Sequence, residues 1–141
     1  MWDKIMQFFG RNRGYSKVLV DKTILVIDDG QAERTLMSKI LSDRGCRVVT
    51  AADGQTGLEN ANLQNPDLIL LDYLMPGLNG KEVCRRLKSE AKTKSIPVVF
   101  LTGSTNVVEC YDVGADYYLS KPISAQALIK QLELTFQELS A

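Results

Sequence analysis

The segment LILLDYLMPGLNG, residues 68–80, decides the fold that this sequence predicts. Its first four residues are continuously apolar, which is typical of a strand covered on both faces of a parallel sheet. The run ends directly at an acidic residue, Asp72. A buried central strand with one carboxylate at its carboxyl end is therefore the starting point.

Short apolar runs and helix-like patterns alternate on both sides of this segment. Strands are predicted over residues 24–27, 48–49, 68–71, 98–101 and 117–119. Three helices are predicted from apolar residues that share one helical face. The first carries Leu36, Met37, Ile40 and Leu41 and ends at Gly45, and the second carries Val83 and Leu87. The third begins after Ser124 as N-cap and carries Ala125, Leu128, Ile129, Leu132, Phe136 and Leu139.

This alternation predicts the class of the fold. Five strands joined through helices by short loops favour an α/β, flavodoxin-like, doubly wound parallel sheet with helices on both faces. The commonest strand order for such a chain is 2-1-3-4-5. Ligands of these folds lie outside the carboxyl ends of the strands.

Polar residues directly follow four of the five predicted strands. They are Asp28 and Asp29, then Asp72, Thr102 and Lys121. In the order 2-1-3-4-5 these four strands are neighbours, about 4.8 Å apart. We therefore expect the five side chains to converge on one cleft.

Three carboxylates in one cleft need a compensating charge. Two of them about 4 Å apart repel by roughly 4 kcal/mol at an effective dielectric constant of 20. Lys121 supplies one positive charge only, and an open, oxygen-rich site suits Mg²⁺ better than Ca²⁺. The chain has no histidine and its three cysteines are scattered, which disfavours zinc and copper.

A carboxylate beside Mg²⁺, a hydroxyl and a lysine can accept a phosphoryl group. Asp72 is the better nucleophile because it stands alone at the end of a central strand. Asp28 and Asp29 are better placed to hold the metal.

These residues, with their neighbours, resemble the receiver domain of two-component response regulators, of the stand-alone, CheY-like kind. The likeness runs from about Thr23 to the C-terminus. It is carried by residues 24–29, residues 70–77 with Gly80, residues 101–103, residues 114–116, and Lys121-Pro122.

The resemblance implies a role for each site residue. Asp72 would take its phosphoryl group from a phosphohistidine on a sensor histidine kinase or a histidine phosphotransfer protein. Asp29 and Asp72 would bind Mg²⁺ directly, Asp28 would assist through water, and the backbone carbonyl of Leu74 would complete the protein ligands.

The resemblance also implies how the signal leaves the site. Thr102 and Lys121 would bind the phosphoryl group, and Lys121-Pro122 would be a cis peptide. Thr102 would move toward the phosphoryl group and Tyr118 would rotate inward, so that the surface offered to a downstream protein changes. Tyr117 competes with Tyr118 for this switch role.

Two features depart from the family pattern. The interval from Thr102 to Lys121 is shorter than expected by roughly one helical turn, so the helix within it is predicted to be truncated or to begin late. The partner surface is then expected to be altered there. The second departure is an N-terminal extension, residues 1–22, ahead of a receiver domain at 23–141.

The extension carries apolar residues on one helical face, followed by basic residues. Three interpretations stay open, namely a short amphipathic helix that contacts a membrane or a partner, a helix folded onto its own domain, and a frayed tail. The apolar residues are Trp2, Ile5, Met6 and Phe9, and the basic residues are Arg11, Arg13 and Lys17.

Composition narrows the function. The 141 residues are 45% apolar, which suits one domain. Basic and acidic residues number 17 each, so no net charge attracts nucleic acid. The chain has neither a 20-residue apolar run nor a signal peptide, and its cysteines suggest reduced thiols, so a cytoplasmic location is expected.

We expect a phosphoryl-accepting switch rather than a turnover enzyme, with no appended output domain unless the sequence is a piece of a longer chain. One alternative is a haloacid-dehalogenase-type phosphatase. Its first motif needs two acids separated by one residue, whereas Asp28 and Asp29 are contiguous. The other alternative is a protein interaction module that acts without phosphorylation.

Overall fold

The computed structural model describes residues 15–103 and 107–140. Five parallel strands form one sheet in the order β2-β1-β3-β4-β5, which confirms the predicted flavodoxin-like fold. The strands are β1 (Thr23–Ile27), β2 (Arg47–Ala51), β3 (Leu68–Asp72), β4 (Val98–Thr102) and β5 (Tyr117–Ser120). The helices are α2 (Gln31–Asp43), α3 (Gly54–Gln64), α4 (Gly80–Ser89), α5 (Val107–Asp112) and α6 (Ala125–Ser140).

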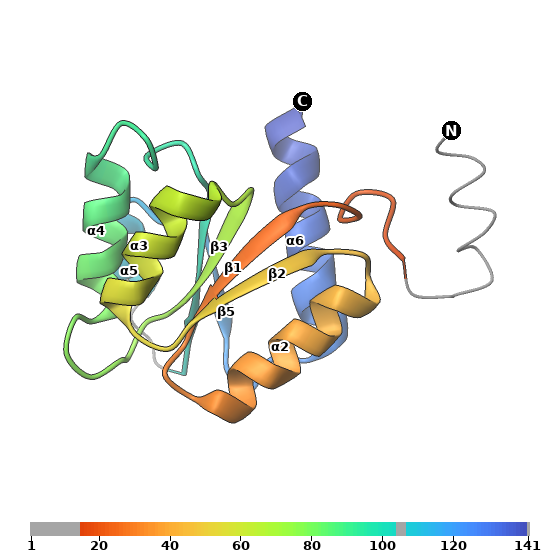
Figure 1. The fold of residues 1–141 in the computed structure, drawn as a ribbon, viewed down its shortest axis with the longest axis horizontal. Helices are drawn as coiled ribbons and strands as arrows, with labels where there is room; N and C mark the ends of the chain where they lie inside the picture. Colours follow the sequence, from red (N-terminus) through yellow and green to blue (C-terminus); the bar gives the residue numbers. More distant parts are fainter. Residues whose placement is uncertain (1–14, 104–106, 141) are drawn as a thin grey trace.

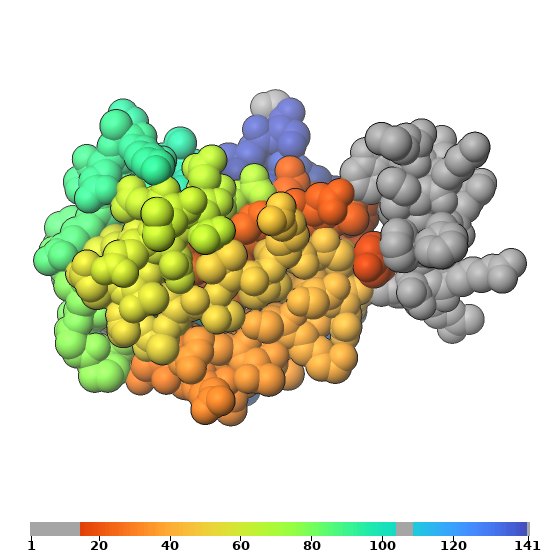
Figure 2. Space-filling model, in the orientation of Figure 1, coloured from red at the N-terminus to blue at the C-terminus, as the bar shows by residue number. Residues whose placement is uncertain are grey.

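The sheet divides the apolar core into two layers. Alternate residues of each strand point to opposite faces, so that Leu25 and Ile27 of β1 join one cluster while Ile24 and Val26 join the other. Helices α3, α4 and α5 cover the first face, and α2 and α6 cover the second (Figure 1). Figure 2 shows α2 in orange and α3 in yellow over the side in view.

Helix α3 has no counterpart among the predicted helices. Its buried residues are Gly54, Gly57 and Ala61, too small to form a visible apolar pattern. A Cβ on Gly57 would lie 2.5 Å from a side-chain carbon of Ile27, so the small residues let α3 pack close to β1. Asp53 caps the helix by accepting a hydrogen bond from the backbone N–H of Thr56.

Some residues of the predicted apolar helical faces are not buried. Leu36 is 55% exposed, because α2 turns Met37 and Leu41 toward the sheet and leaves Leu36 at the rim. Leu139 is 60% exposed, since the last turn of α6 projects beyond the sheet (Figure 1). Ala125, in the first turn of α6, is also exposed.

The helix between β4 and β5, α5, is described over Val107–Asp112, and residues 104–106 directly before it lie outside the described residues. The truncated or late helix expected in this interval therefore stays a prediction. Isolated helices of this length are unstable in water, so contacts with the rest of the domain must hold α5 in place.

The described part of the N-terminal extension packs against the domain. The side chain of Leu19 is fully buried beside α2 and α6 residues, and the Ser16 hydroxyl donates a hydrogen bond to Glu133 of α6 at 2.7 Å. Lys22 lies over the ring of Phe136, 5.1 Å from its centre. Residues 1–14, with the apolar and basic residues named above except Lys17, lie outside the described residues.

We therefore expect Leu19→Ala to lower the free energy of unfolding by about 2–4 kcal/mol, as in other buried large-to-small substitutions. Urea unfolding measures this. Leu63→Ala is the matched control, since Leu63 is 77% exposed on α3. Equal stability of the two variants would place residue 19 outside the folding unit, in line with a domain that starts at residue 23.

Among residues 15–103 and 107–140, no helix combines the length and the apolar character that a membrane span requires.

Candidate functional site

Polar side chains gather where four neighbouring strands end. Asp28 and Asp29 follow β1, Asp72 is the last residue of β3, Thr102 is the last residue of β4, and Lys121 follows β5. The strand order places β3 between β1 and β4, so these ends form one rim. Asp28, Asp72 and Thr102 are buried, whereas Asp29 is exposed.

The structure brings the three carboxylates and the lysine together. One carboxylate oxygen from each of Asp28, Asp29 and Asp72 lies within 4.8 Å of the other two. The Lys121 Nζ atom is 3.2 Å from Asp72 Oδ1 and 3.6 Å from Asp28 Oδ2. The backbone N–H of Lys121 also donates to the Thr102 carbonyl at 2.8 Å, which fixes β5 beside β4 at this rim.

The environment shifts the pKa of both charged partners. Burial raises the pKa of Asp72 to about 6, and the neighbouring Asp28 carboxylate adds to the rise, while Lys121 opposes it. Burial lowers the pKa of Lys121, but the carboxylates of Asp72 and Asp28 outweigh burial and leave it raised. Lys121 is therefore a firmly charged ammonium group between two acids.

The carboxylates present fit a hard divalent cation. Asp28 Oδ2 is buried and has no hydrogen-bond partner among the described residues, although such an atom normally has one. Lys121 alone cannot neutralise three acids in this space. An oxygen-only donor set of this kind is what Mg²⁺ prefers.

Comparisons with known proteins agree with this geometry. Residues 24–133 match the family described as "Response regulator receiver domain". This chain belongs to that family. The receiver is 36% identical over 112 residues to Protein PilH of Pseudomonas aeruginosa, covering 77% of this chain and 93% of PilH. It is 40% identical over 109 residues to the transcriptional regulatory protein AfsQ1 of Streptomyces coelicolor, covering 75% of this chain and 47% of AfsQ1.

The receiver spans about half the length, or less, of the first curated relatives that it matches, such as AfsQ1 at 47% and the response regulator PleD of Caulobacter vibrioides at 23%. PilH, covered at 93%, is a relative of similar size.

Solved structures show the same fold. The chemotaxis protein CheY4 of Vibrio cholerae is 32% identical, with a TM-score of 0.78 over 82% of this chain and 98% of that chain. The receiver domain of the sensor histidine kinase PA1611 of Pseudomonas aeruginosa is 26% identical, with a TM-score of 0.78 over 84% of this chain and 99% of that chain. That protein is described with a magnesium ion coordinated in its active-site cleft.

The structure also describes the remaining residues that the resemblance assigned to the site or the switch. The peptide bond between Lys121 and Pro122 is cis. The side chain of Leu74 is exposed, and its backbone N–H hydrogen-bonds the Asp72 carboxylate. Tyr118 packs against the apolar core layer on the α3, α4 and α5 side of the sheet. Tyr117 packs against the apolar core layer on the α2 and α6 side.

The start of α4 touches the backbone of Asp72. The N–H of Gly80 donates to the Tyr73 carbonyl at 3.2 Å, and a Cβ on Gly80 would lie 2.3 Å from the Asp72 carbonyl oxygen. Real Cβ atoms essentially never approach so closely, and the atoms they would meet are backbone atoms that cannot rotate away. Glycine at this position therefore lets α4 support the strand end that carries Asp72.

We expect Gly80→Ala to lower the free energy of unfolding by about 1–3 kcal/mol through overpacking. Gly103→Ala is the control, because among the described residues its added Cβ would meet the Cβ of Lys121 alone, at 4.0 Å. Chemical unfolding of both variants measures the difference. If Gly80→Ala is as stable as the control, the backbone of Asp72 and Tyr73 is free to shift.

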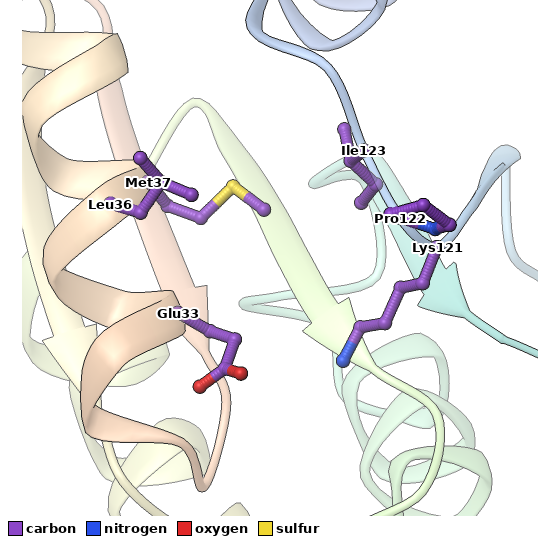
Figure 3. Close-up of a pocket in the computed structure, with 6 residues that line it drawn as sticks. All are labelled: Glu33, Leu36, Met37, Lys121, Pro122 and Ile123. Atoms are coloured by element: carbon purple, nitrogen blue, oxygen red, sulfur yellow. The ribbon is translucent and has the colours of Figure 1, made fainter.

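A pocket of about 450 Å³ opens beside Lys121, between α2 and the loop after β5. Figure 3 shows Leu36 and Met37 on one side and Pro122 and Ile123 on the other, with the Glu33 carboxylate and the Lys121 ammonium group toward one end. The pocket is mostly apolar and adjoins the carboxylate cluster.

Two residues near the cluster did not emerge from the sequence. Glu33 lines the pocket opposite Lys121 and adds to the rise in its pKa. Arg34 donates from Nη1 to the Asp28 carbonyl at 2.8 Å. Their places in the first turn of α2, directly after Asp28 and Asp29, are the signal that could have indicated them.

Proposed function

We propose that the receiver is a phosphorylation-dependent switch in which Asp72 accepts a phosphoryl group from a phosphohistidine on a donor protein. The observation that carries this proposal is the buried Asp72 carboxylate, paired with Lys121 at 3.2 Å inside a cluster of three acids. Membership of the receiver family supports it.

In the proposed reaction an Asp72 oxygen bonds to phosphorus as the bond from phosphorus to the donor's imidazole nitrogen breaks. The products are an acyl phosphate on Asp72 and a free histidine on the donor. The Lys121 ammonium group and the Thr102 hydroxyl hold phosphoryl oxygens at the strand ends. The 141 residues contain no histidine, so the phosphohistidine is proposed to lie outside this sequence.

We assign the Mg²⁺ site to Asp28, Asp29, Asp72 and the backbone carbonyl of Leu74. A bound Mg²⁺ would neutralise the acidic cluster and the charge on the transferred phosphoryl group. The buried Asp28 Oδ2, which has no hydrogen-bond partner among the described residues, and the exposed Asp29 carboxylate support this assignment.

For the switch we propose Thr102 and Tyr118. Tyr118 is partly buried, and its ring meets the ring of Tyr111 on α5 edge to face, with centres 6.1 Å apart. It therefore lies between the strand end and a short helix at the surface. Rotation of Tyr118 would change the protein-binding surface around α5.

Incubation with acetyl phosphate and Mg²⁺, followed by mass spectrometry, tests the acceptor. Addition of one phosphoryl group at Asp72 is the expected result. Turnover of p-nitrophenyl phosphate would instead support the phosphatase alternative. An unchanged protein after addition of Mg²⁺ and beryllofluoride would support the phosphorylation-independent interaction module.

The donor protein is proposed to dock over the pocket beside Lys121, because its phosphohistidine must reach Asp72. The exposed, apolar Leu36 lies at the edge of that pocket. A cytoplasmic location, shared with a sensor histidine kinase or a histidine phosphotransfer protein, belongs to the same proposal, and cell fractionation tests it.

Leu36→Asp is expected to slow phosphotransfer from the donor protein at least about fivefold, as for a truncated interface residue that costs more than 1 kcal/mol. Labelling by acetyl phosphate should stay unchanged, because Leu36 does not touch Asp72. Leu63→Asp, on the exposed side of α3, is the matched control. Equal transfer rates for the two variants would exclude this docking surface.

A further inference from the structure

Tyr73, the residue directly after the proposed acceptor, is held on both sides of its backbone. Its N–H donates to the Leu101 carbonyl at 3.0 Å, and its carbonyl accepts from the N–H of Gly80 at 3.2 Å. Leu101 precedes Thr102, the proposed phosphate-binding hydroxyl. A displacement of either strand end at the phosphorylation site must therefore displace Tyr73.

The side chain of Tyr73 is confined as well. It is buried, and its ring meets the fully buried ring of Phe100 edge to face, with centres 5.4 Å apart. The side chain cannot easily rotate away within such a packed layer. A backbone shift at Tyr73 therefore carries through to the end of the ring.

The end of that ring contacts α5. The Tyr73 hydroxyl donates a hydrogen bond to the Glu109 carboxylate. This hydrogen bond, together with burial, raises the pKa of Tyr73 to about 12, so the hydroxyl stays protonated and able to donate. Hydrogen bonds to charged acceptors are the stronger ones in proteins.

Helix α5 is held by contacts with the rest of the domain. Its described part has six residues, too few for a helix that is stable by itself. Besides Glu109, Tyr111 joins it to the domain through the edge-to-face contact with Tyr118. Cys110, fully buried in the core, also joins α5 to the domain, and the Tyr73 hydrogen bond adds a polar contact to this apolar one.

We propose that the hydrogen bond between Tyr73 and Glu109 couples the chemical state of Asp72 to the position of α5, which makes Tyr73 a positioning residue for the output surface. The inference rests on the proposed function, and it identifies a second connection to α5 beside the one through Tyr118.

The strength of the Tyr73–Glu109 hydrogen bond and the affinity of the site for a phosphoryl analogue must affect each other equally. If binding of a phosphoryl analogue at Asp72 changes the strength of this hydrogen bond, loss of the bond must change the affinity for the analogue by the same factor. The change should be the same whether the donor or the acceptor is removed, because one bond is lost in either case. The effect of removing both should not be the sum.

The test uses beryllofluoride with Mg²⁺ as the analogue and measures two quantities, the dissociation constant by calorimetry and amide hydrogen exchange in α5. The variants are Tyr73→Phe, Glu109→Leu and the double variant. Glu109→Gln keeps an acceptor oxygen and tests for rescue. Tyr111→Phe is the control, since it removes a hydroxyl from the same helix and keeps the ring.

We expect Tyr73→Phe and Glu109→Leu to change the dissociation constant by about three- to tenfold in the same direction. This is less than the full strength of a hydrogen bond to a charged group, because only the difference in its strength between the two states of Asp72 contributes. The double variant should match either single variant, and the response of α5 exchange to beryllofluoride should shrink in all three. Glu109→Gln and Tyr111→Phe should stay within about twofold of the unmodified protein.

Additive effects in the double variant, or an unchanged α5 response in Tyr73→Phe, would overturn the coupling while the proposed function stands. If the unmodified protein fails to bind beryllofluoride, the proposed function is wrong and this inference falls with it.

Discussion

Asp72→Asn is expected to abolish phosphoryl labelling and, at the same time, to make the metal-free protein more stable at neutral pH. Labelling is lost because the amide nitrogen and oxygen of asparagine cannot form the acyl phosphate. Stability rises because the buried Asp72 carboxylate is held beside Asp28, and the substitution removes one of the two charges without changing the size of the side chain.

The sign of the pH dependence follows from the raised pKa. Asp72 has a pKa of about 6 in the folded protein against an ordinary 3.8, first because of burial and then because of Asp28. The folded state thus binds the proton more tightly than the unfolded state, and this carboxyl lowers stability as pH rises from about 4 to about 6. The cost above that range is of the order of 1–3 kcal/mol.

Urea unfolding in EDTA at pH 4 and at pH 7 measures this effect. The gain in stability from Asp72→Asn should be present at pH 7 and small at pH 4. Asp43→Asn is the control, since Asp43 is an exposed carboxylate of α2. A gain of equal size at both pH values would show that the charge of Asp72 is not its source.

Mg²⁺ is expected to stabilise the unmodified protein, and Asp29→Asn is expected to remove most of that effect. A ligand at 100 times its dissociation constant stabilises a folded protein by about 2.7 kcal/mol. Asp29 is exposed, so its replacement should leave the apo fold intact while it removes one of the three clustered negative charges.

Thermal unfolding with and without Mg²⁺ gives the result, again with Asp43→Asn as control. Equal stabilisation of Asp29→Asn and the unmodified protein would show that the cation binds elsewhere. Loss of stabilisation in the control as well would indicate a general ionic effect.

Much of the fold could be predicted because the central strands are continuous apolar runs in the sequence. Leu68–Leu71 and residues 98–101 are fully buried on both faces of the sheet, which leaves continuous apolar runs that periodicity detects. Helix α3 escaped detection for the opposite reason. Its buried face consists of glycine and alanine, which reveal close packing only once the neighbouring Ile27 is known.

The candidate site could be predicted because its parts share one position, the carboxyl end of a strand. Strand order alone then brings Asp28, Asp72 and Lys121 together. The contacts of Glu33 with the pocket and of Tyr73 with Glu109 depend instead on how a helix is placed over the sheet. No local pattern in the sequence encodes such a placement.

The sheet has a final consequence for how two proteins could use this domain in turn. The pocket beside Lys121 opens next to α2, while α5 and the Tyr73 side chain belong to the layer on the far side of the strands. A donor seated at the pocket would leave the α5 layer uncovered. Under the proposed function, phosphorylation of Asp72 by a donor protein and binding of a downstream protein at the α5 layer therefore need not compete for the same surface. A bound downstream protein would then stay in place while the phosphoryl group is lost and renewed.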